Sequence, residues 1–358
     1  MGEKYMSLEK NIFNEFREYI NDFHTLNNVS IFGAGSYGIK VYKLLNEKGF
    51  NIENFFDNNE KLWDTEVDGK KVLNPSKISG DISIVVASSW SKEIVKQLKE
   101  NKIFKGKIYL SDPWGNFCDT SISDEDIKQL EFLYNKLEDI ESKKVLINVL
   151  KSRMCIEEFN NVQYEQYFHP IVHAKNNDII IDGGAFIGDT IQALNNDKTL
   201  NNIEIYSFEP EDKHFSLLQN EAKNSRFECF PIKLGLYDKD TTLKFFADEQ
   251  ISGMCMVEEN GNIIIHTTSI DNYCNEHQIT PSYIKLDIEG AEKEALIGAK
   301  NTIKKYKPKL AICIYHKYKD LWELPYFINE IFGEYEFYLG HHMDYWFETI
   351  LYAYPVEK

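Results

Sequence analysis

Residues 179–190 read IIIDGGAFIGDT: an apolar run ends at an acid, Asp182, and a glycine-rich turn follows. A short apolar run bounded by glycines is typical of a buried strand, so this stretch predicts a strand, a turn and then a helix. The spacing from Asp182 through Gly184 to Gly188 differs from the phosphate-binding glycine fingerprint. The carboxylate at the strand tip would also repel a phosphate. The turn therefore favours a ligand that carries positive charge.

Apolar runs alternate with helical or loop segments from this point to the end of the chain. The runs occupy residues 178–184, 203–210, 227–236, 281–290 and 308–316. Such alternation predicts an α/β fold with a doubly wound parallel sheet. Residues 335–355 alternate bulky side chains and predict a further pair of strands, antiparallel, at the edge of that sheet.

A second glycine-rich turn lies in residues 29–41, VSIFGAGSYGIKV, and it lacks the leading acid. Gly33, Gly35 and Gly38 follow the G-x-G-x-x-G spacing, and Asp57 lies 24 residues after Gly33, where a ribose-binding carboxylate is expected. Further apolar runs end near residues 57, 89 and 112. We expect a Rossmann-like sheet with these four residues as a nucleotide or sugar-nucleotide site; the alternative is that the glycines only pack a helix against a strand.

The chain of 358 residues exceeds the roughly 250–300 at which a single hydrophobic core stops growing, so two domains are expected. We place a Rossmann-like domain at residues 1–118, a charged helical connector at 119–165 and a second Rossmann-like domain at 166–358. The connector opens with the capping-box-like sequence SISDED, which begins at Ser121.

Composition narrows the classes of partner and compartment. A formal net charge of -17 argues against nucleic acid as a partner. No stretch approaches the roughly 18–20 consecutive apolar residues of a membrane span, and the first ten residues lack the apolar core of a signal peptide. The cysteines show no C-x-x-C pair and no zinc-ligand spacing: Cys118, Cys155, Cys229, Cys255, Cys274 and Cys313. They are typical of reduced thiols, and we expect a cytoplasmic protein.

S-adenosylmethionine has the charge that the turn at Asp182 favours, because it carries an ammonium and a sulfonium and no phosphate. A second acid should end the next strand and hold the ribose hydroxyls. Glu209 occupies that position, 27 residues after Asp182. Two acids at two strand tips therefore predict this cofactor; the alternative is an acid that only caps a helix and an acidic turn unrelated to it.

Four segments together carry a more specific resemblance: IIIDGGAFIGDT, YSFEP, SYIKLDIEGAEKEALIGA and ETILYAY. Residues from about 145 to 355 resemble the FkbM-type methyltransferases, S-adenosylmethionine-dependent enzymes that act largely on hydroxyls of sugars and glycosylated natural products. The resemblance implies a class I methyltransferase fold for the second domain. It also implies an O-methyltransferase whose acceptor is a sugar hydroxyl of a glycan, a glycoconjugate or a nucleotide-linked sugar.

By the same resemblance, the cofactor site can be placed on this sequence. Residues around the methionine moiety are Asp182, Gly183, Gly184 and Gly188, with Asp189 and Thr190 at the start of the next helix and Glu209 at the ribose. The segment QYFHP, which includes Tyr167 and Phe168, is expected to fold over the cofactor or, alternatively, to be ordinary packing.

Methyl transfer to a sugar hydroxyl needs a base that removes the hydroxyl proton. His316 follows the fifth strand of the second half, and Asp287 and Glu289 follow the fourth, where open α/β sheets bind their ligands. All three are candidate bases. Asp287 and Glu289 are alternatively ligands for a Mg²⁺ that acidifies a diol, because Mg²⁺ takes oxygen donors.

His341 and His342 lie beside Tyr345 and Trp346, a composition typical of sugar-binding clefts, although adjacent strand residues point to opposite faces. The N-terminal half resembles the small Rossmann-like domains of sugar-modifying enzymes, which suggests a nucleotide-sugar acceptor. A homodimer is also expected. Three alternatives stay open: an N-methyltransferase for an amino sugar, an NAD(P)-dependent sugar oxidoreductase and a non-catalytic assembly protein of a glycan pathway.

Overall fold

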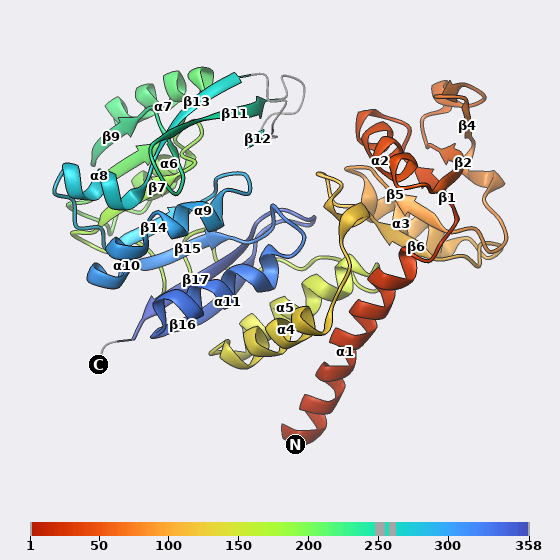
Figure 1. The fold of residues 1–358 in the computed structure, drawn as a ribbon, viewed down its shortest axis with the longest axis horizontal. Helices are drawn as coiled ribbons and strands as arrows, with labels where there is room; N and C mark the ends of the chain where they lie inside the picture. Colours follow the sequence, from red (N-terminus) through yellow and green to blue (C-terminus); the bar gives the residue numbers. More distant parts are fainter. Residues whose placement is uncertain (1, 248–254, 258–262, 357–358) are drawn as a thin grey trace. The chain divides into compact units, whose positions relative to one another are not determined.

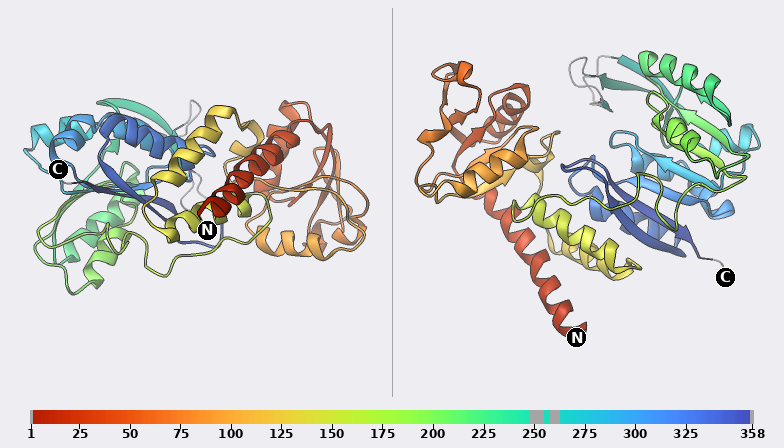
Figure 2. Two further views of the ribbon diagram at one scale, coloured as in Figure 1. Left: turned by 90° about the horizontal axis from the view of Figure 1, so that it is seen from below. Right: turned by 180° about the vertical axis from the view of Figure 1, so that it is seen from behind.

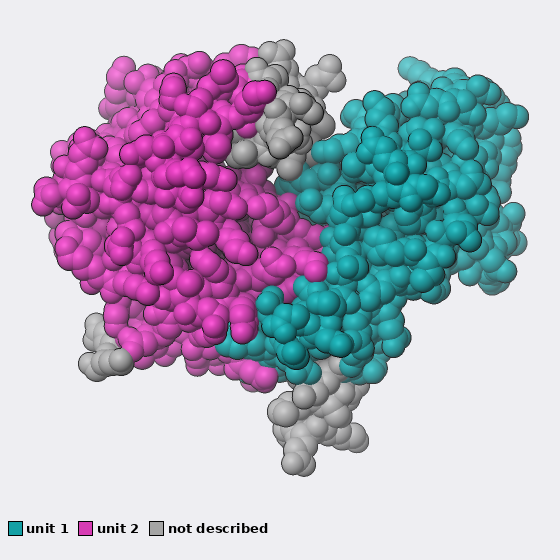
Figure 3. All heavy atoms as spheres, in the orientation of Figure 1, with its two compact units in different colours: residues 1–134, 143–161, 343–347 teal, residues 135–142, 162–342, 348–358 magenta. Residues whose placement is uncertain are grey.

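The protein is described by a computed structural model that covers residues 2–247, 255–257 and 263–356, with side chains from Asn11 onward up to Lys244 and again from Ile263. The side chain of Cys255 lies outside this part. The chain divides into two compact units (Figure 3). Unit 1 comprises residues 1–134, 143–161 and 343–347, and unit 2 comprises residues 135–142, 162–342 and 348–358.

Unit 1 contains a six-stranded sheet in the order β3-β4-β2-β1-β5-β6. The strands are β1 (Asn28–Phe32), β2 (Asn51–Phe56), β3 (Glu66–Val67), β4 (Lys70–Leu73), β5 (Ile84–Val86) and β6 (Ile108–Leu110). All neighbouring strands pair in parallel except β3 and β4, which pair antiparallel. The sequence did not predict the strands β3 and β4. The central strands β1 and β5 are buried on both faces, which explains their continuous apolar sequences.

Five helices accompany this sheet: α1 (Gly2–Phe23), α2 (Ser36–Glu47), α3 (Ser91–Glu100), α4 (Asp124–Lys136) and α5 (Ile140–Arg153). The helix α2 follows the glycine turn directly, as the sequence predicts. Helices α4 and α5 occupy the predicted connector.

Unit 2 contains a seven-stranded sheet in the order β16-β17-β15-β14-β7-β8-β9. Its strands are β7 (Ile179–Gly183), β8 (Glu204–Phe208), β9 (Glu228–Ile232), β14 (Tyr283–Leu286), β15 (Lys309–Cys313), β16 (Tyr335–His341) and β17 (Thr349–Pro355). Strand β17 pairs antiparallel with both β15 and β16, so the reversed strand lies one position inside the edge of the sheet.

The helices of unit 2 cover both faces of this sheet (Figures 1 and 2). They are α6 (Asp189–Asn196), α7 (Asp212–Asn224), α8 (Ile270–Glu276), α9 (Glu292–Ile297), α10 (Lys300–Tyr306) and α11 (Asp320–Phe332). α6 packs on α7, whereas α10 packs on α8 and α11. In the described parts of the chain, no helix is both long enough and apolar enough to cross a membrane.

A separate four-stranded sheet was not predicted from the sequence. It has the order β10-β13-β11-β12 and consists of β10 (Gly235–Leu236), β11 (Thr241–Ala247), β12 (Cys255–Val257) and β13 (Ile263–Thr268). On β13, Ile264 is 69% exposed, whereas the next residue, Ile265, is 5% exposed. The sequence signal was weak because exposed residues alternate with buried ones along β13.

Candidate active site

The glycine turn of residues 184–188 connects β7 to α6 and adopts a conformation that requires glycine. Gly184 and Gly188 have φ values of +70° and +94°. A Cβ on Gly184 would lie 1.7 Å from the backbone oxygen of Asp287, so no side chain fits there. The backbone N–H groups of Gly184 and Ala185 both donate to the carbonyl of Phe208. The turn is therefore fixed against the carboxyl ends of β14 and β8.

Asp182 is completely buried and has a partner within the protein. Its Oδ1 lies 3.1 Å from the Nζ of Lys285, and the hydroxyls of Thr190 and Ser207 approach its oxygens at 3.4 Å. The sequence argument assumed that this carboxylate meets the positive charge of a ligand. The structure corrects that reason, because the cation beside Asp182 is Lys285.

Glu209 follows β8 and is 6% exposed. Each of its carboxylate oxygens accepts one backbone N–H, from Phe186 at 3.1 Å and from Glu211 at 2.9 Å. Burial raises the pKa of this carboxyl to about 7, although the two hydrogen bonds oppose the shift. The side chain thus lies beside the glycine turn, held by the backbone of Phe186.

Asp287 follows β14 and accepts hydrogen bonds from two tyrosine hydroxyls. Tyr167 donates to Oδ2 and Tyr315 to Oδ1, both at 3.0 Å. Burial would raise the pKa of Asp287, but Lys285, His316 and the hydrogen bonds outweigh it and lower the pKa. Asp287 is therefore an anion, and the predicted segment at Tyr167 contacts the carboxylate end of the site. Phe168, next to it, is half-buried and donates its backbone N–H to Glu165.

The structure brings His316 together with Asp287 and Glu289, as the sequence predicts. Its Nε2 lies 3.5 Å from Asp287 and 3.6 Å from Glu289, and its Nδ1 lies 2.9 Å from Glu292. Burial lowers the pKa of this imidazole, but the three carboxylates raise it to about 10. His316 is therefore charged at neutral pH, which argues against the predicted role of proton acceptor.

Glu289 has the properties that a base needs. A quarter of its side chain is exposed, and burial together with Asp287 and Glu292 raises its pKa to about 8, against the effect of His316. A carboxylate with a pKa near the working pH can accept a proton from a bound hydroxyl.

Glu348 also belongs to this cluster, and sequence reasoning missed it. Gln166 donates a hydrogen bond to its carboxylate. Burial and Asp287 raise its pKa to about 8. Oxygen atoms of Asp287 and Glu348 and the sulfur of Cys313 lie within 4.8 Å of one another, the one group of potential metal ligands in the described residues. A buried thiol is a poor ligand for Mg²⁺, which takes oxygen donors.

Backbone strain marks the same edge of the sheet. Four non-glycine residues here have positive φ: Tyr167 at +66°, Phe186 at +46°, Glu289 at +57° and Glu348 at +66°. Such conformations cost of order 1–3 kcal/mol each and gather at functional sites. Five further residues of unit 2 have positive φ away from this edge, so backbone strain alone does not identify the active site: Asn177, Asn202, Gln278, Lys307 and Glu334.

The glycines of unit 1 divide into two kinds. A Cβ on Gly33 would lie 2.3 Å from the oxygen of Ala87, and a Cβ on Gly38 would lie 1.8 Å from the oxygen of Gly33. Gly35 has open space at that position. Asp57 accepts the backbone N–H groups of Ala34 at 2.8 Å and of Asn59 at 2.7 Å. Gly33, Gly38 and Asp57 therefore hold the turn, and of the three glycines in this turn only Gly35 has open space at the Cβ position.

The aromatic residues near the C-terminus do not form a sugar platform. Trp346 is 1% exposed and lies in unit 1, where the guanidinium of Arg153 stacks on its ring. Tyr345, also in unit 1, donates its hydroxyl to the carbonyl of Ser88. His341 is buried against Thr349, and His342 bonds the hydroxyl of Tyr352. This corrects the sequence interpretation.

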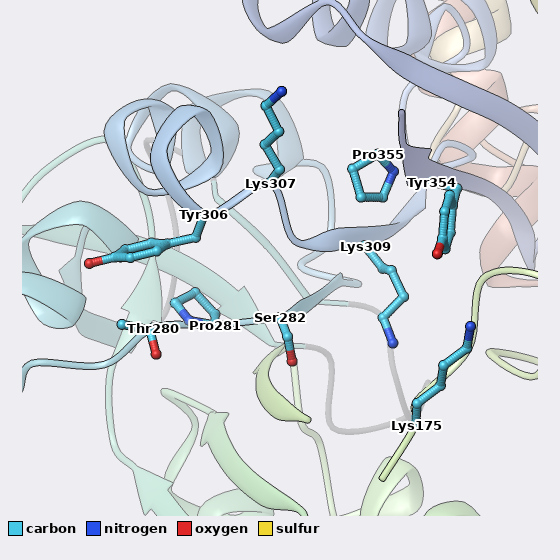
Figure 4. Close-up of a pocket in the computed structure, with 9 residues that line it drawn as sticks. All are labelled: Lys175, Thr280, Pro281, Ser282, Tyr306, Lys307, Lys309, Tyr354 and Pro355. Carbon is cyan, nitrogen blue, oxygen red and sulfur yellow. The ribbon is translucent and has the colours of Figure 1, made fainter. Parts of the chain in front are cut away.

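A pocket of about 310 Å³ lies at the opposite edge of the sheet, at the amino ends of β14 and β15 (Figure 4). It is lined by Lys175, Thr280, Pro281, Ser282, Tyr306, Lys307, Lys309, Tyr354 and Pro355. Lys309 bonds the carboxylate of Asp178, and Lys307 pairs with Glu334. We assign no ligand to it, because these two ammonium groups already have anionic partners.

The strand order of unit 2, with β17 reversed between β15 and β16 and a glycine turn after β7, defines a class I methyltransferase-like fold. Residues 182–349 match the methyltransferase FkbM domain family. Residues 25–109 match the family described as C2185-like, N-terminal. The second half of the chain is therefore an FkbM-type methyltransferase domain, and the protein is a methyltransferase. This family uses S-adenosylmethionine in general.

The first of three similar structures agrees with this fold over most of the chain. The crystal structure of methyltransferase FkbM from Methylobacillus flagellatus KT has a TM-score of 0.63 at 19% identity and covers 92% of this chain and 90% of its own. Precorrin-6y C5,15-methyltransferase from Geobacter metallireducens GS-15 has a TM-score of 0.29 at 11% identity and covers 50% of this chain and 79% of its own. UDP-D-quinovosamine 4-dehydrogenase from Vibrio fischeri has a TM-score of 0.21 at 19% identity and covers 28% of this chain and 97% of its own. The last two scores are too low to support an inference. No curated protein matches the chain.

Proposed function

We propose that the protein is an S-adenosylmethionine-dependent O-methyltransferase that methylates a sugar hydroxyl of a glycan, a glycoconjugate or a nucleotide-linked sugar. The observation that supports it most is the junction of the glycine turn with the carboxylate cluster. Gly184 abuts the backbone of Asp287, and Glu289 follows two residues later. A methyl donor in the turn and an acceptor at the carboxylates would lie side by side.

The residues of the turn fit S-adenosylmethionine. Glu209 uses one lone pair on each oxygen for a backbone N–H and keeps others for the two ribose hydroxyls. The backbone from Gly183 to Gly188, with Asp189 and Thr190 at the start of α6, would hold the methionine end, and Asp182 would act through Lys285. When bound, the cofactor supplies the sulfonium methyl group.

Glu289 is the proposed general base. The proton of the acceptor hydroxyl passes to the carboxylate of Glu289. Asp287 is already an anion, and it orients the acceptor by accepting a hydrogen bond from another of the acceptor's polar groups. The charged His316 stabilises both carboxylates. Its imidazolium lies between Asp287 and Glu289, where a Mg²⁺ bound to both would have to sit, so we derive no step through a metal.

Substitution of the base tests this function. The protein is incubated with S-adenosylmethionine and a panel of UDP-sugars, oligosaccharides and amino sugars, and products are detected by mass spectrometry. We expect a methyl ether on a sugar, and a loss of roughly 10²–10⁴-fold in kcat for Glu289→Gln. Glu330→Gln, an exposed site on α11, is the matched control.

Three outcomes would change the proposal. Methylation on nitrogen of an amino sugar would replace O-methylation, since a neutral amine needs no base as strong as a carboxylate. Full activity of Glu289→Gln would remove Glu289 from the mechanism. No turnover with any acceptor class would favour the assembly protein.

We further propose that unit 1 binds the nucleotide part of a nucleotide-linked sugar at the turn around Gly35, with Gly33, Gly38 and Asp57 supporting that turn. The open space at Gly35 supports this, because a pyrophosphate must approach the backbone there. A cytoplasmic location and a homodimer stay predictions. Calorimetric titration with UDP-sugars and with NAD separates the nucleotide-sugar proposal from the oxidoreductase alternative.

A further inference from the structure

Lys285 is a charged residue in the most buried part of the sheet. All four residues of β14 are buried, and Lys285 is 1% exposed. Its Nζ donates to the carbonyl of Gly184 at 2.7 Å and of Gly183 at 3.2 Å, and it lies 3.1 Å from the carboxylate of Asp182. An ammonium group has three donors, so all of them are directed at the residues that begin the cofactor turn.

The same ammonium acts on the acceptor side of the site. It lies 5.5 Å from the ring centroid of Tyr167, whose hydroxyl donates to Asp287. Among the influences that lower the pKa of Asp287, Lys285 is the largest. The backbone N–H of Asp287 donates to the carbonyl of Gly183, which Lys285 also holds. One buried cation thus contacts both halves of the site.

We propose that Lys285 is a positioning residue that couples the cofactor turn to the acceptor carboxylate. Its ammonium group holds the carbonyls of Gly183 and Gly184 in place, and its charge keeps Asp287 anionic. This inference rests on the proposed function, because it assigns the turn to the methyl donor and Asp287 to the acceptor.

The other edge of the sheet offers a matched control. Lys309, on the neighbouring strand β15, has its Nζ 2.6 Å from the carboxylate of Asp178 and 2.9 Å from the carbonyl of His173. Lys285 and Lys309 are both buried strand lysines paired with an acid and a backbone carbonyl. Only Lys285 lies at the carboxyl ends of the strands, so Lys309→Met reports the structural cost alone.

The test compares Lys285→Met, Lys309→Met and the double variant Asp182→Asn/Lys285→Met. Calorimetry gives the affinity for S-adenosylhomocysteine, and thermal unfolding gives the stability. We expect Lys285→Met to bind about ten-fold or more weakly, since hydrogen bonds from a charged donor are lost. Lys309→Met should lose comparable stability and keep its affinity within about two-fold. The double variant should regain stability, because no buried carboxylate is left unpaired, and should remain weak in binding.

A pH profile provides a readout that a purely structural lysine would not move. Without Lys285, the pKa of Asp287 rises, so its carboxyl carbon, followed by NMR, should titrate at higher pH in Lys285→Met and at the wild-type pH in Lys309→Met. If Lys285→Met does not fold, the double variant replaces it in these measurements.

The outcomes distinguish a failure of the proposed function from a failure of the role proposed for Lys285. Wild-type protein that does not bind S-adenosylhomocysteine would contradict the proposed function and this inference together. Tight binding by the wild type, with equal affinity in the double variant or in Lys285→Met, would overturn only the role of Lys285.

Discussion

At the scale of single residues, the sequence predicted which side chains meet but not what each one does. Asp287, Glu289 and His316 gather as predicted because the carboxyl ends of parallel strands share one edge. Their charges depend on neighbours that come from elsewhere in the chain, such as Glu348. Glu348 is the first residue of the segment ETILYAY, but nothing in that segment tells that the reversed strand β17 brings its carboxylate to Asp287.

One missed residue did have a signal. Lys285 interrupts an otherwise apolar run two positions before Asp287, and a lysine in a buried strand needs an anionic partner. The partner could have been sought among the acids at strand tips, which include Asp182. A charge inside an apolar strand is therefore as informative as the motif that follows it.

The carboxylate cluster predicts how stability depends on pH. The pKa of His316 is raised to about 10, and those of Glu289 and Glu348 are raised to about 8. Because the folded state keeps these protons longer than the unfolded state, the two carboxyls lose their contribution to stability between about pH 4.5 and 8, and His316 loses its contribution between about pH 6.5 and 10. Thermal unfolding across these ranges should show a decreasing melting temperature.

The variant Glu289→Gln should flatten this decrease. It removes one carboxyl with a raised pKa and lowers the pKa of His316, so both contributions shrink. Glu330→Gln should follow the wild-type curve. A melting temperature that rises toward pH 10 in the wild type would contradict the assigned protonation states.

At the scale of elements, the sequence predicted the parallel strands and missed the sheet of β10 to β13. The central parallel strands β14 and β15 are buried on both faces, which gives continuous apolar runs. On β13, buried and exposed residues alternate, and Ile264 on it is exposed, so the apolar signal is shorter and less regular. The position of β17 inside the sheet depends on long-range pairing, which no local pattern specifies.

The glycine turn of unit 1 gives a prediction at this scale. Gly38→Ala places a Cβ 1.8 Å from the backbone oxygen of Gly33, so α2 must move away from β1 and unit 1 should lose stability. Gly35→Ala meets open space at an ordinary φ of -80° and should unfold like the wild type. Chemical denaturation measures both.

The same pair of variants tests the nucleotide proposal. Weaker binding of a UDP-sugar by the stable variant Gly35→Ala would support a ligand at this turn. Unchanged binding would place the nucleotide elsewhere, and a stable Gly38→Ala would contradict the packing role.

At the scale of the whole molecule, the family match covers residues 182–349, which include the glycine turn, Glu209 and the carboxylate cluster. The match does not name an acceptor, and the sequence suggests one only by resemblance. The domain boundaries at residues 118 and 165 stay predictions. What the whole chain does therefore depends first on whether the turn holds the methyl donor.

The most direct measurement is calorimetric titration of the intact protein with S-adenosylhomocysteine, repeated for Glu209→Gln and Glu204→Gln. These two acids lie at opposite ends of β8, and only Glu209 is at the glycine turn. The account predicts binding by the wild type, about ten-fold weaker binding by Glu209→Gln and unchanged binding by Glu204→Gln. Absence of binding to the wild type, or equal affinities in all three proteins, would contradict the assignment of this turn as the methyl donor site.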